Sequence, residues 1–201
     1  MTQSIEELER VLKRIEKHLD LSRAVLQCLP LVFWSAVLPL MYLVLRFVVP
    51  ASVELVLGVS MGAVLSLWIL LEIKHAEMVL ERLELFFGRM RVSRRLYTGL
   101  QLASCIGSIA LFYALAAEGV LNPSTWLLPA LSLMTALHAA IDAVLGRGID
   151  VEMCPMIVIP GAGYALLTLF PIHGEDMASI MIVSASMSLT AFLYLRRAFR
   201  P

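Results

Sequence analysis

The most constraining feature of this sequence is a series of apolar blocks, each about as long as a bilayer is thick. A helix of roughly 20 apolar residues spans the hydrocarbon core of a membrane. Hydrophobic residues make up 60% of the 201 residues, whereas a soluble domain is nearer about 45–50% apolar. The sequence therefore predicts an all-α polytopic integral membrane protein. Its six predicted transmembrane helices are about 29–49, 53–71, 96–117, 125–145, 155–170 and 177–195.

The second block, 53–71, passes into residues 72–95 without a Gly, Pro or turn cluster where they join. In 72–95 apolar residues alternate at steps of three and four with charged residues between them, which is the pattern of an amphipathic helix. The stripe consists of Ile73, Ala76, Leu80, Leu83, Phe87 and Met90. We expect one helix that leaves the lipid and continues into water.

Residues 1–27 form a second amphipathic segment, followed by a membrane domain from residue 28 to 201. Ser4 and Glu7 have the spacing of a capping box, so a helix should begin here. Its apolar stripe consists of Ile5, Leu8, Leu12, Ile15 and Leu19. Three interpretations stay open: a coiled-coil helix for a partner, antiparallel packing against the 73–87 stripe within or between chains, and a helix that lies on the lipid surface.

The basic residues predict the orientation in the membrane. If residues 72–95 are cytoplasmic, fifteen of the sixteen Lys and Arg residues lie on that side and only Arg46 lies outside. This agrees with the positive-inside rule and places both termini in the cytoplasm. Four arginines are expected at lipid headgroups: Arg89, Arg91, Arg94 and Arg95. The formal net charge is zero, so a nucleic-acid partner is not expected.

Polar residues inside a span are costly and are functional candidates by default. His138 and Asp142 are four residues apart in the fourth predicted span, so a helix places them on one face, with Thr135 one turn earlier. This set predicts a relay for protons or cations. The alternative is that Asp142 is simply hydrated, because it falls within one turn of the cytoplasmic interface.

The fifth predicted span is interrupted in its middle by Pro160, Gly161 and Gly163. Proline removes a backbone donor and glycine loosens a helix, and broken helices form ion and substrate sites in transporters. A kink that packs against a neighbour is the alternative. In the second span, Gly58 and Gly62 form a small-residue row that favours close helix packing.

No catalytic motif, metal site or cofactor is predicted. Cys28, Cys105 and Cys154 are far apart and have no Cys/His spacing typical of zinc. A haem or metal between His75 and His138 is an alternative that no other feature supports. The N-terminus lacks the pattern of a cleaved signal peptide.

These patterns favour a non-catalytic membrane subunit or scaffold that assembles through its cytoplasmic helices, either with copies of itself or with other membrane subunits in the bilayer. The alternative is a small transporter or channel that uses the broken fifth span with His138 and Asp142.

Overall fold

The computed structural model describes residues 2–47, 94–144 and 150–199, together with Leu67, Leu71, Lys74 and Met78. All elements of this part of the chain are helical. They are α1 (Thr2–Phe47), α3 (Arg94–Ala117), α4 (Leu127–Val144), the 3₁₀ helix η1 (Val151–Met153), α5 (Cys154–Leu169) and α6 (Glu175–Ala198). Within these residues, five helices are long and apolar enough to cross a membrane. The predicted all-α class is confirmed here, and the five apolar helices indicate a membrane protein.

Several predicted segments cannot be compared with the structure. The second span, with Gly58 and Gly62, lies outside the described residues apart from Leu67 and Leu71. Helix 72–95 does so apart from Lys74, Met78 and the first residues of α3. For the other spans, the predicted limits fall within about three residues of the helix ends in α3, α4, α5 and α6.

The predicted boundary between residues 27 and 28 falls inside one continuous helix. The helix α1 runs without a break from Thr2 to Phe47, through Pro30 and Pro39, and only its part Ala24–Val44 is apolar enough to span a membrane. No glycine or turn sequence separates the charged part from the apolar part, so one uninterrupted helix contains both.

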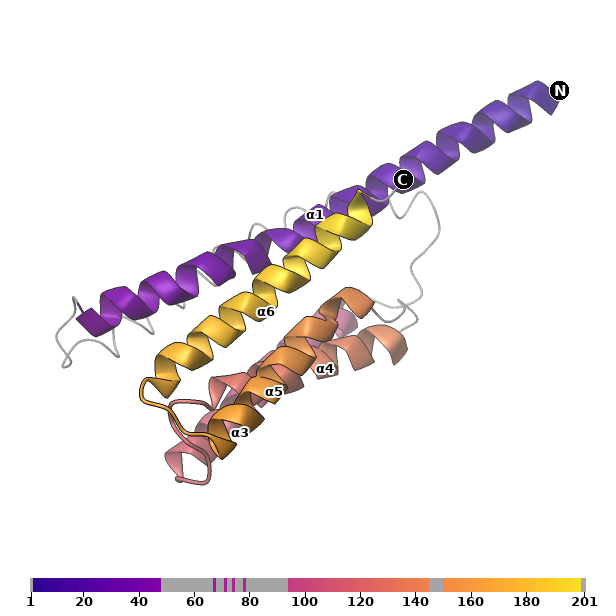
Figure 1. Ribbon diagram of the computed structural model, residues 1–201. Helices are drawn as coiled ribbons and strands as arrows, with labels where there is room; N and C mark the ends of the chain where they lie inside the picture. Colours follow the sequence, from indigo (N-terminus) through magenta and orange to yellow (C-terminus); the bar gives the residue numbers. More distant parts are fainter. Residues whose placement is uncertain are drawn as a thin grey trace.

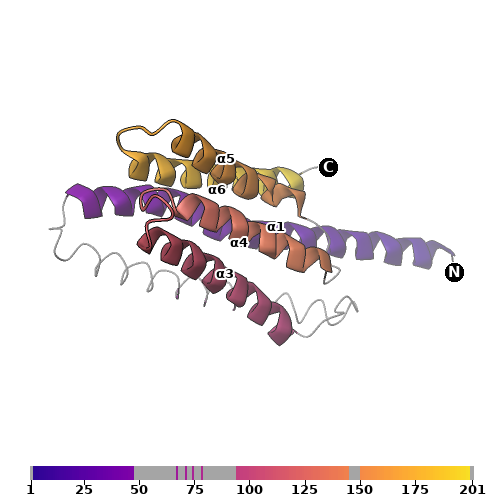
Figure 2. The same ribbon diagram turned by 90° about the horizontal axis from the view of Figure 1, so that it is seen from below.

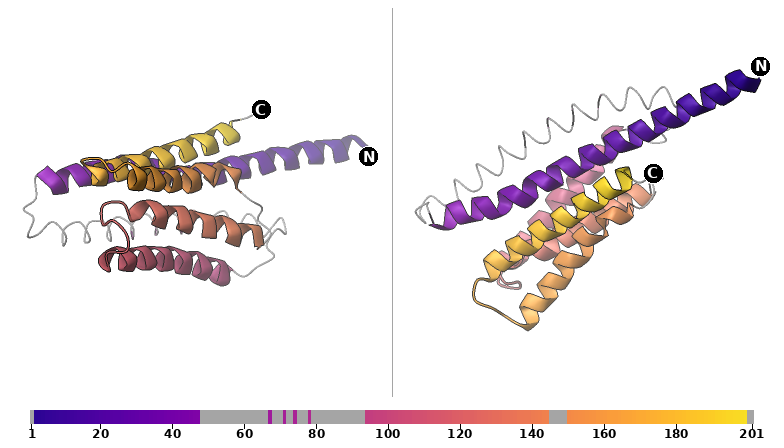
Figure 3. Two further views of the ribbon diagram at one scale, coloured as in Figure 1. Left: turned by 60° about the horizontal axis from the view of Figure 1, so that its bottom comes forward. Right: turned by 45° about the horizontal axis from the view of Figure 1, so that its top comes forward.

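The helices lie side by side, with their axes roughly parallel or antiparallel to one another (Figure 1). Helix α1 packs along α6, α6 along α5, α5 along α4, and α4 along α3. Figure 2 shows α3 at one edge of the described bundle. The charged part of α1 extends beyond the end of α6, and both marked chain ends lie toward that same end of the bundle (Figures 1 and 3). We call this the C-terminal end of the bundle.

The apolar core is small and lies between α4, α5 and α6. Its buried residues are Leu128, Leu131, Met156, Leu167 and Val183. Outside it, large apolar side chains such as Leu40, Ile106 and Phe192 are exposed. Such a surface suits lipid, in which helices associate through close packing and polar contacts and not through hydrophobic burial.

Two serine hydroxyls bond to backbone carbonyls beside prolines. Pro39 has no N–H to bond to the Ser35 carbonyl four residues earlier, and Ser184 of α6 donates its hydroxyl to that carbonyl. On α5 the arrangement differs: Ser132 of α4 donates to the Ile157 carbonyl over 2.7 Å, whereas the carbonyl that Pro160 leaves without an amide is that of Met156. Each of the two serine bonds joins two helices.

The predicted interruption of the fifth span is therefore wrong for the backbone: α5 is one helix from Cys154 to Leu169. The glycines serve close packing instead. A Cβ atom at Gly161 would lie 3.2 Å from Ser132 Oγ, and one at Gly163 would lie 2.9 Å from Ile182 side-chain atoms of α6.

We predict that Ser184→Ala destabilises the protein by about 1 kcal/mol, because the Ser35 carbonyl then loses a donor that its own helix cannot supply. Reversible unfolding in mixed micelles, followed by circular dichroism, would measure the change. Ser188→Ala, on an exposed position of the same helix, is the control and should be close to neutral. Equal stability of the two variants would contradict the role given to Ser184.

Gly163→Ala should destabilise the protein by about 1–3 kcal/mol, since the added methyl group overlaps Ile182 and forces α5 and α6 apart. Gly107→Ala on α3 is the matched control, because no atom lies within 4 Å of its added Cβ. The same unfolding measurement applies. A Gly163→Ala variant as stable as the control would show that α5 and α6 are not closely packed there.

Candidate functional site

His138 and Asp142 lie on the side of α4 that faces α3. The Tyr97 hydroxyl donates to Asp142 Oδ1 over 2.7 Å. His138 Nε2 lies 3.1 Å from the Gln101 carbonyl oxygen and 3.4 Å from Cys105 Sγ. The Gln101 side-chain amide donates to the Tyr97 hydroxyl. We call these five residues the α3–α4 seam.

The seam follows from helical spacing. Tyr97, Gln101 and Cys105 recur every four residues on α3, as do His138 and Asp142 on α4, so each set lies along one side of its helix. The helices run antiparallel, which places Asp142 opposite Tyr97 and His138 opposite Gln101 and Cys105. The sequence analysis missed the three α3 residues, although their matching spacing was a signal that could have found them.

The other candidate residues do not join the seam. Thr135 is buried, and its hydroxyl donates to the Leu131 carbonyl of its own helix over 2.9 Å. Pro160 is buried on α5, where Gly161 and Gly163 approach Ser132 and Ile182. The two predicted groups, one on α4 and one on α5, therefore do not form a common site among the described residues.

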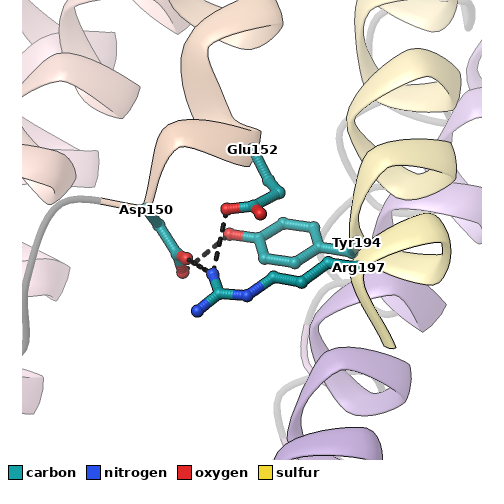
Figure 4. A network of polar contacts seen from close by, with 4 residues as sticks. All are labelled: Asp150, Glu152, Tyr194 and Arg197. Atoms are coloured by element: carbon teal, nitrogen blue, oxygen red, sulfur yellow. Dashed lines mark hydrogen bonds and ion pairs between the residues drawn. The ribbon is translucent and has the colours of Figure 1, made fainter. Parts of the chain in front are cut away.

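A second polar cluster lies at the C-terminal end of the bundle (Figure 4). Tyr194 is buried on α6, and its hydroxyl donates to Asp150 Oδ2 over 2.9 Å. Arg197 Nη1 donates to Asp150 Oδ1 and to Glu152 Oε2, each over 3.0 Å. We call these four residues the Asp150 cluster. It attaches the end of α6 to the start of η1.

The Asp150 cluster and the seam have separate hydrogen-bond partners. Asp150 and Glu152 bond to Tyr194 and Arg197 at the end of α6. Asp142, in the last turn of α4, bonds to Tyr97 of α3. At the opposite end of the bundle, Tyr42 donates to Asp176 over 2.5 Å and Asn122 donates to Glu175.

The predicted interaction stripe on α1 is exposed where it is described. Leu8, Leu12 and Ile15 are 64%, 44% and 38% exposed. The side chains of Ile5 and Leu19 are outside the described set. The same holds for Ile73, Leu80, Leu83, Phe87, His75, Arg89 and Arg91, and for the side chains of Arg94 and Arg95.

Among the described residues, no group of three or more His, Cys, Asp or Glu side chains could hold a metal ion. The seam offers hydrogen-bond donors and acceptors on two facing helices. Searches for similar proteins found no matching family model, no similar curated protein and no similar solved structure.

Tyr194→Phe should destabilise the protein by about 1 kcal/mol, because the buried Asp150 cluster loses its hydroxyl donor while the ring keeps its place. Tyr113→Phe is the control: Tyr113 is exposed on α3, and its ring contact with Trp126 is retained. Thermal unfolding of both variants in the same detergent would compare them. The proposed bond would be unimportant if the two variants unfolded at one temperature.

Proposed function

We propose that this protein is a non-catalytic membrane subunit that assembles through the exposed stripe of its N-terminal helix, with that helix and both chain ends in the cytoplasm. The observation that carries the proposal is the position of Leu8, Leu12 and Ile15. Their side chains are exposed. Figure 1 shows the N-terminal part of α1 extending past the other described helices.

An apolar stripe on a charged helix in water favours a helical partner. Residues 5, 8, 12, 15 and 19 follow the a and d positions of a heptad repeat. Around them the helix is charged, as the exposed ion pair between Glu9 and Lys13 illustrates. A stripe of this kind is covered in a coiled coil by the same type of stripe from another helix.

The charges favour a second copy of this chain in parallel orientation. With Leu8 and Ile15 at d positions, Glu9 and Glu16 fall at e positions and Val11 at a g position. Antiparallel pairing brings e positions together, so Glu9 of one copy would face Glu16 of the other. Parallel pairing places Glu16 opposite Val11 and avoids this repulsion. Two copies inserted in one membrane with the same orientation present their N-terminal helices in parallel.

The stripe is short, with little more than two heptads, and such a helix pairs weakly when isolated. Anchorage compensates for this. The stripe belongs to the same continuous helix as the apolar segment Ala24–Val44, so chains in one membrane hold their N-terminal helices close together. Anchorage in one membrane raises the effective concentration of the N-terminal helices, which compensates for the low affinity of a short coiled coil.

Leu12→Asp should dissociate the assembly, because a carboxylate at the centre of the stripe would be buried without a partner. The full chain would be reconstituted in lipid nanodiscs or mild detergent, and the number of copies measured by native mass spectrometry. We expect a dimer for the natural sequence and a shift of at least tenfold toward monomer for the variant.

The matched control is Arg14→Asp, which introduces the same side chain at an exposed position of α1 outside the stripe. It should leave the dimer intact. A natural chain that is monomeric at every protein concentration, or a Leu12→Asp variant that assembles as well as Arg14→Asp, would refute the proposal.

A small transporter or channel is the second candidate, and the observation that favours it is the seam. A row of hydrogen-bonding groups inside an apolar helix pair is a feature of proton and ion pathways. Purified protein in liposomes should then move protons or cations, and Asp142→Asn should reduce that flux. Absence of flux from the natural chain would remove this candidate.

A further inference from the structure

The side of α1 that faces α6 is fixed by contacts along the span. Near the start of the span, Cys28 clusters with two residues of α6, and near its end the Tyr42 hydroxyl donates to Asp176. Between them, the Ser35 carbonyl accepts a hydrogen bond from Ser184. The residues on this side recur at alternating steps of three and four: Cys28, Leu31, Ser35, Leu38 and Tyr42. This side of α1 is therefore occupied by other helices of its own chain.

A different side of α1 is exposed along the whole span. Its residues also recur at steps of three and four, and they are apolar: Val25, Leu29, Val32, Ala36, Leu40, Leu43 and Phe47. This spacing places them along one side of a helix. We call these seven residues the free face of α1.

The free face continues the exposed stripe of the N-terminal part of α1. Counting in sevens from Ile15, at a d position, gives three more d positions in the span: Leu29, Ala36 and Leu43. By the same count, Leu31 and Leu38 on the α6 side fall at f positions, opposite the a and d positions of a helix. The stripe therefore runs on into the face that α6 leaves free.

The geometry of α1 allows this register to hold between two copies. The helix is unbroken from Thr2 to Phe47. A straight helix drifts from a seven-residue repeat by about 20° per heptad, and a left-handed supercoil of two helices corrects that drift. Because α6 packs on the opposite side, two α1 helices can wrap around each other without displacing it. Ala36 is the smallest residue of the free face, so the two backbones can approach closely in the middle of the span.

We propose that the dimer interface continues along α1 through the membrane, with the free face of one copy packed against the free face of a second copy. This inference rests on the proposed pairing of the N-terminal stripes, which brings two α1 helices together where the span begins. A two-fold axis along the membrane normal then places each d residue beside the same residue of the other copy. A second copy presents the same register in the same orientation, so the contact needs no further partner.

The test is disulfide cross-linking of the full chain in lipid vesicles. Leu43→Cys places a thiol at a d position, and Val44→Cys places one at the adjacent e position. The two are matched, because the native side chains are 40% and 38% exposed at nearly the same depth. After mild oxidation we expect about tenfold more symmetric disulfide from Leu43→Cys, since pairing holds two d positions at a high effective concentration.

Mass spectrometry of the linked peptides identifies the symmetric disulfide. The natural chain supplies the background from its own thiols, which are Cys28, Cys105 and Cys154. Each substitution replaces an exposed side chain, so the fold of the bundle should be retained.

Ile15→Cys tests the N-terminal stripe in the same experiment, so the two proposals fail separately. A link in Ile15→Cys, with equal yields from Leu43→Cys and Val44→Cys, would overturn the membrane interface and leave the N-terminal pairing intact. A link in Leu43→Cys without one in Ile15→Cys would also overturn the continuous interface, because pairing would then be confined to the span. Absence of a link in all three variants would refute both proposals.

Discussion

A backbone carbonyl inside a bilayer has no water to bond to, and a proline four residues later removes the amide that would normally bond to it. Pro39 frees the Ser35 carbonyl of α1 in this way, and Ser184 of α6 donates its hydroxyl to that carbonyl. Ser132 of α4 donates to the Ile157 carbonyl of α5, next to the Met156 carbonyl that Pro160 leaves without an amide. The two bonds connect α1 to α6 and α4 to α5.

The other polar contacts lie mainly toward the two ends of the bundle. Tyr42 with Asp176 and Asn122 with Glu175 lie at one end, and the Asp150 cluster lies at the other. Between them the core is small and apolar, with glycines that allow close contact. The seam differs, because its polar groups extend from the C-terminal end of the bundle into the membrane span. Polar side chains inside a span are what make the seam the candidate site.

The sequence predicted the existence and ends of the described helices well, because the hydrophobic length of a segment is a local property. The predicted 96–117 and 177–195 correspond to α3 and α6. It failed where the outcome depended on neighbours. Pro160 suggests a break when read alone, but α5 stays one helix, packed against α4 and α6.

The candidate site was predicted in part for the same reason. His138 and Asp142 stood out as polar residues in an apolar span, whereas Tyr97, Gln101 and Cys105 gain significance only from the antiparallel register of α3 and α4. Tyr194 and Asp150 are 44 residues apart in the chain, and their contact depends on the rotation of α6 about its axis. The pattern of a single sequence contains neither the register between two helices nor the rotation of a helix about its axis.

The continuity of α1 has a mechanical consequence. At about 1.5 Å per residue, its 46 residues form a rod of about 69 Å. Leu12 near one end and Ser35 farther along belong to the same helix, which continues through Pro30. If a partner binds the exposed stripe as proposed, a force on that tip would pass along one backbone to the Ser35 carbonyl and, through its bond with Ser184, to α6.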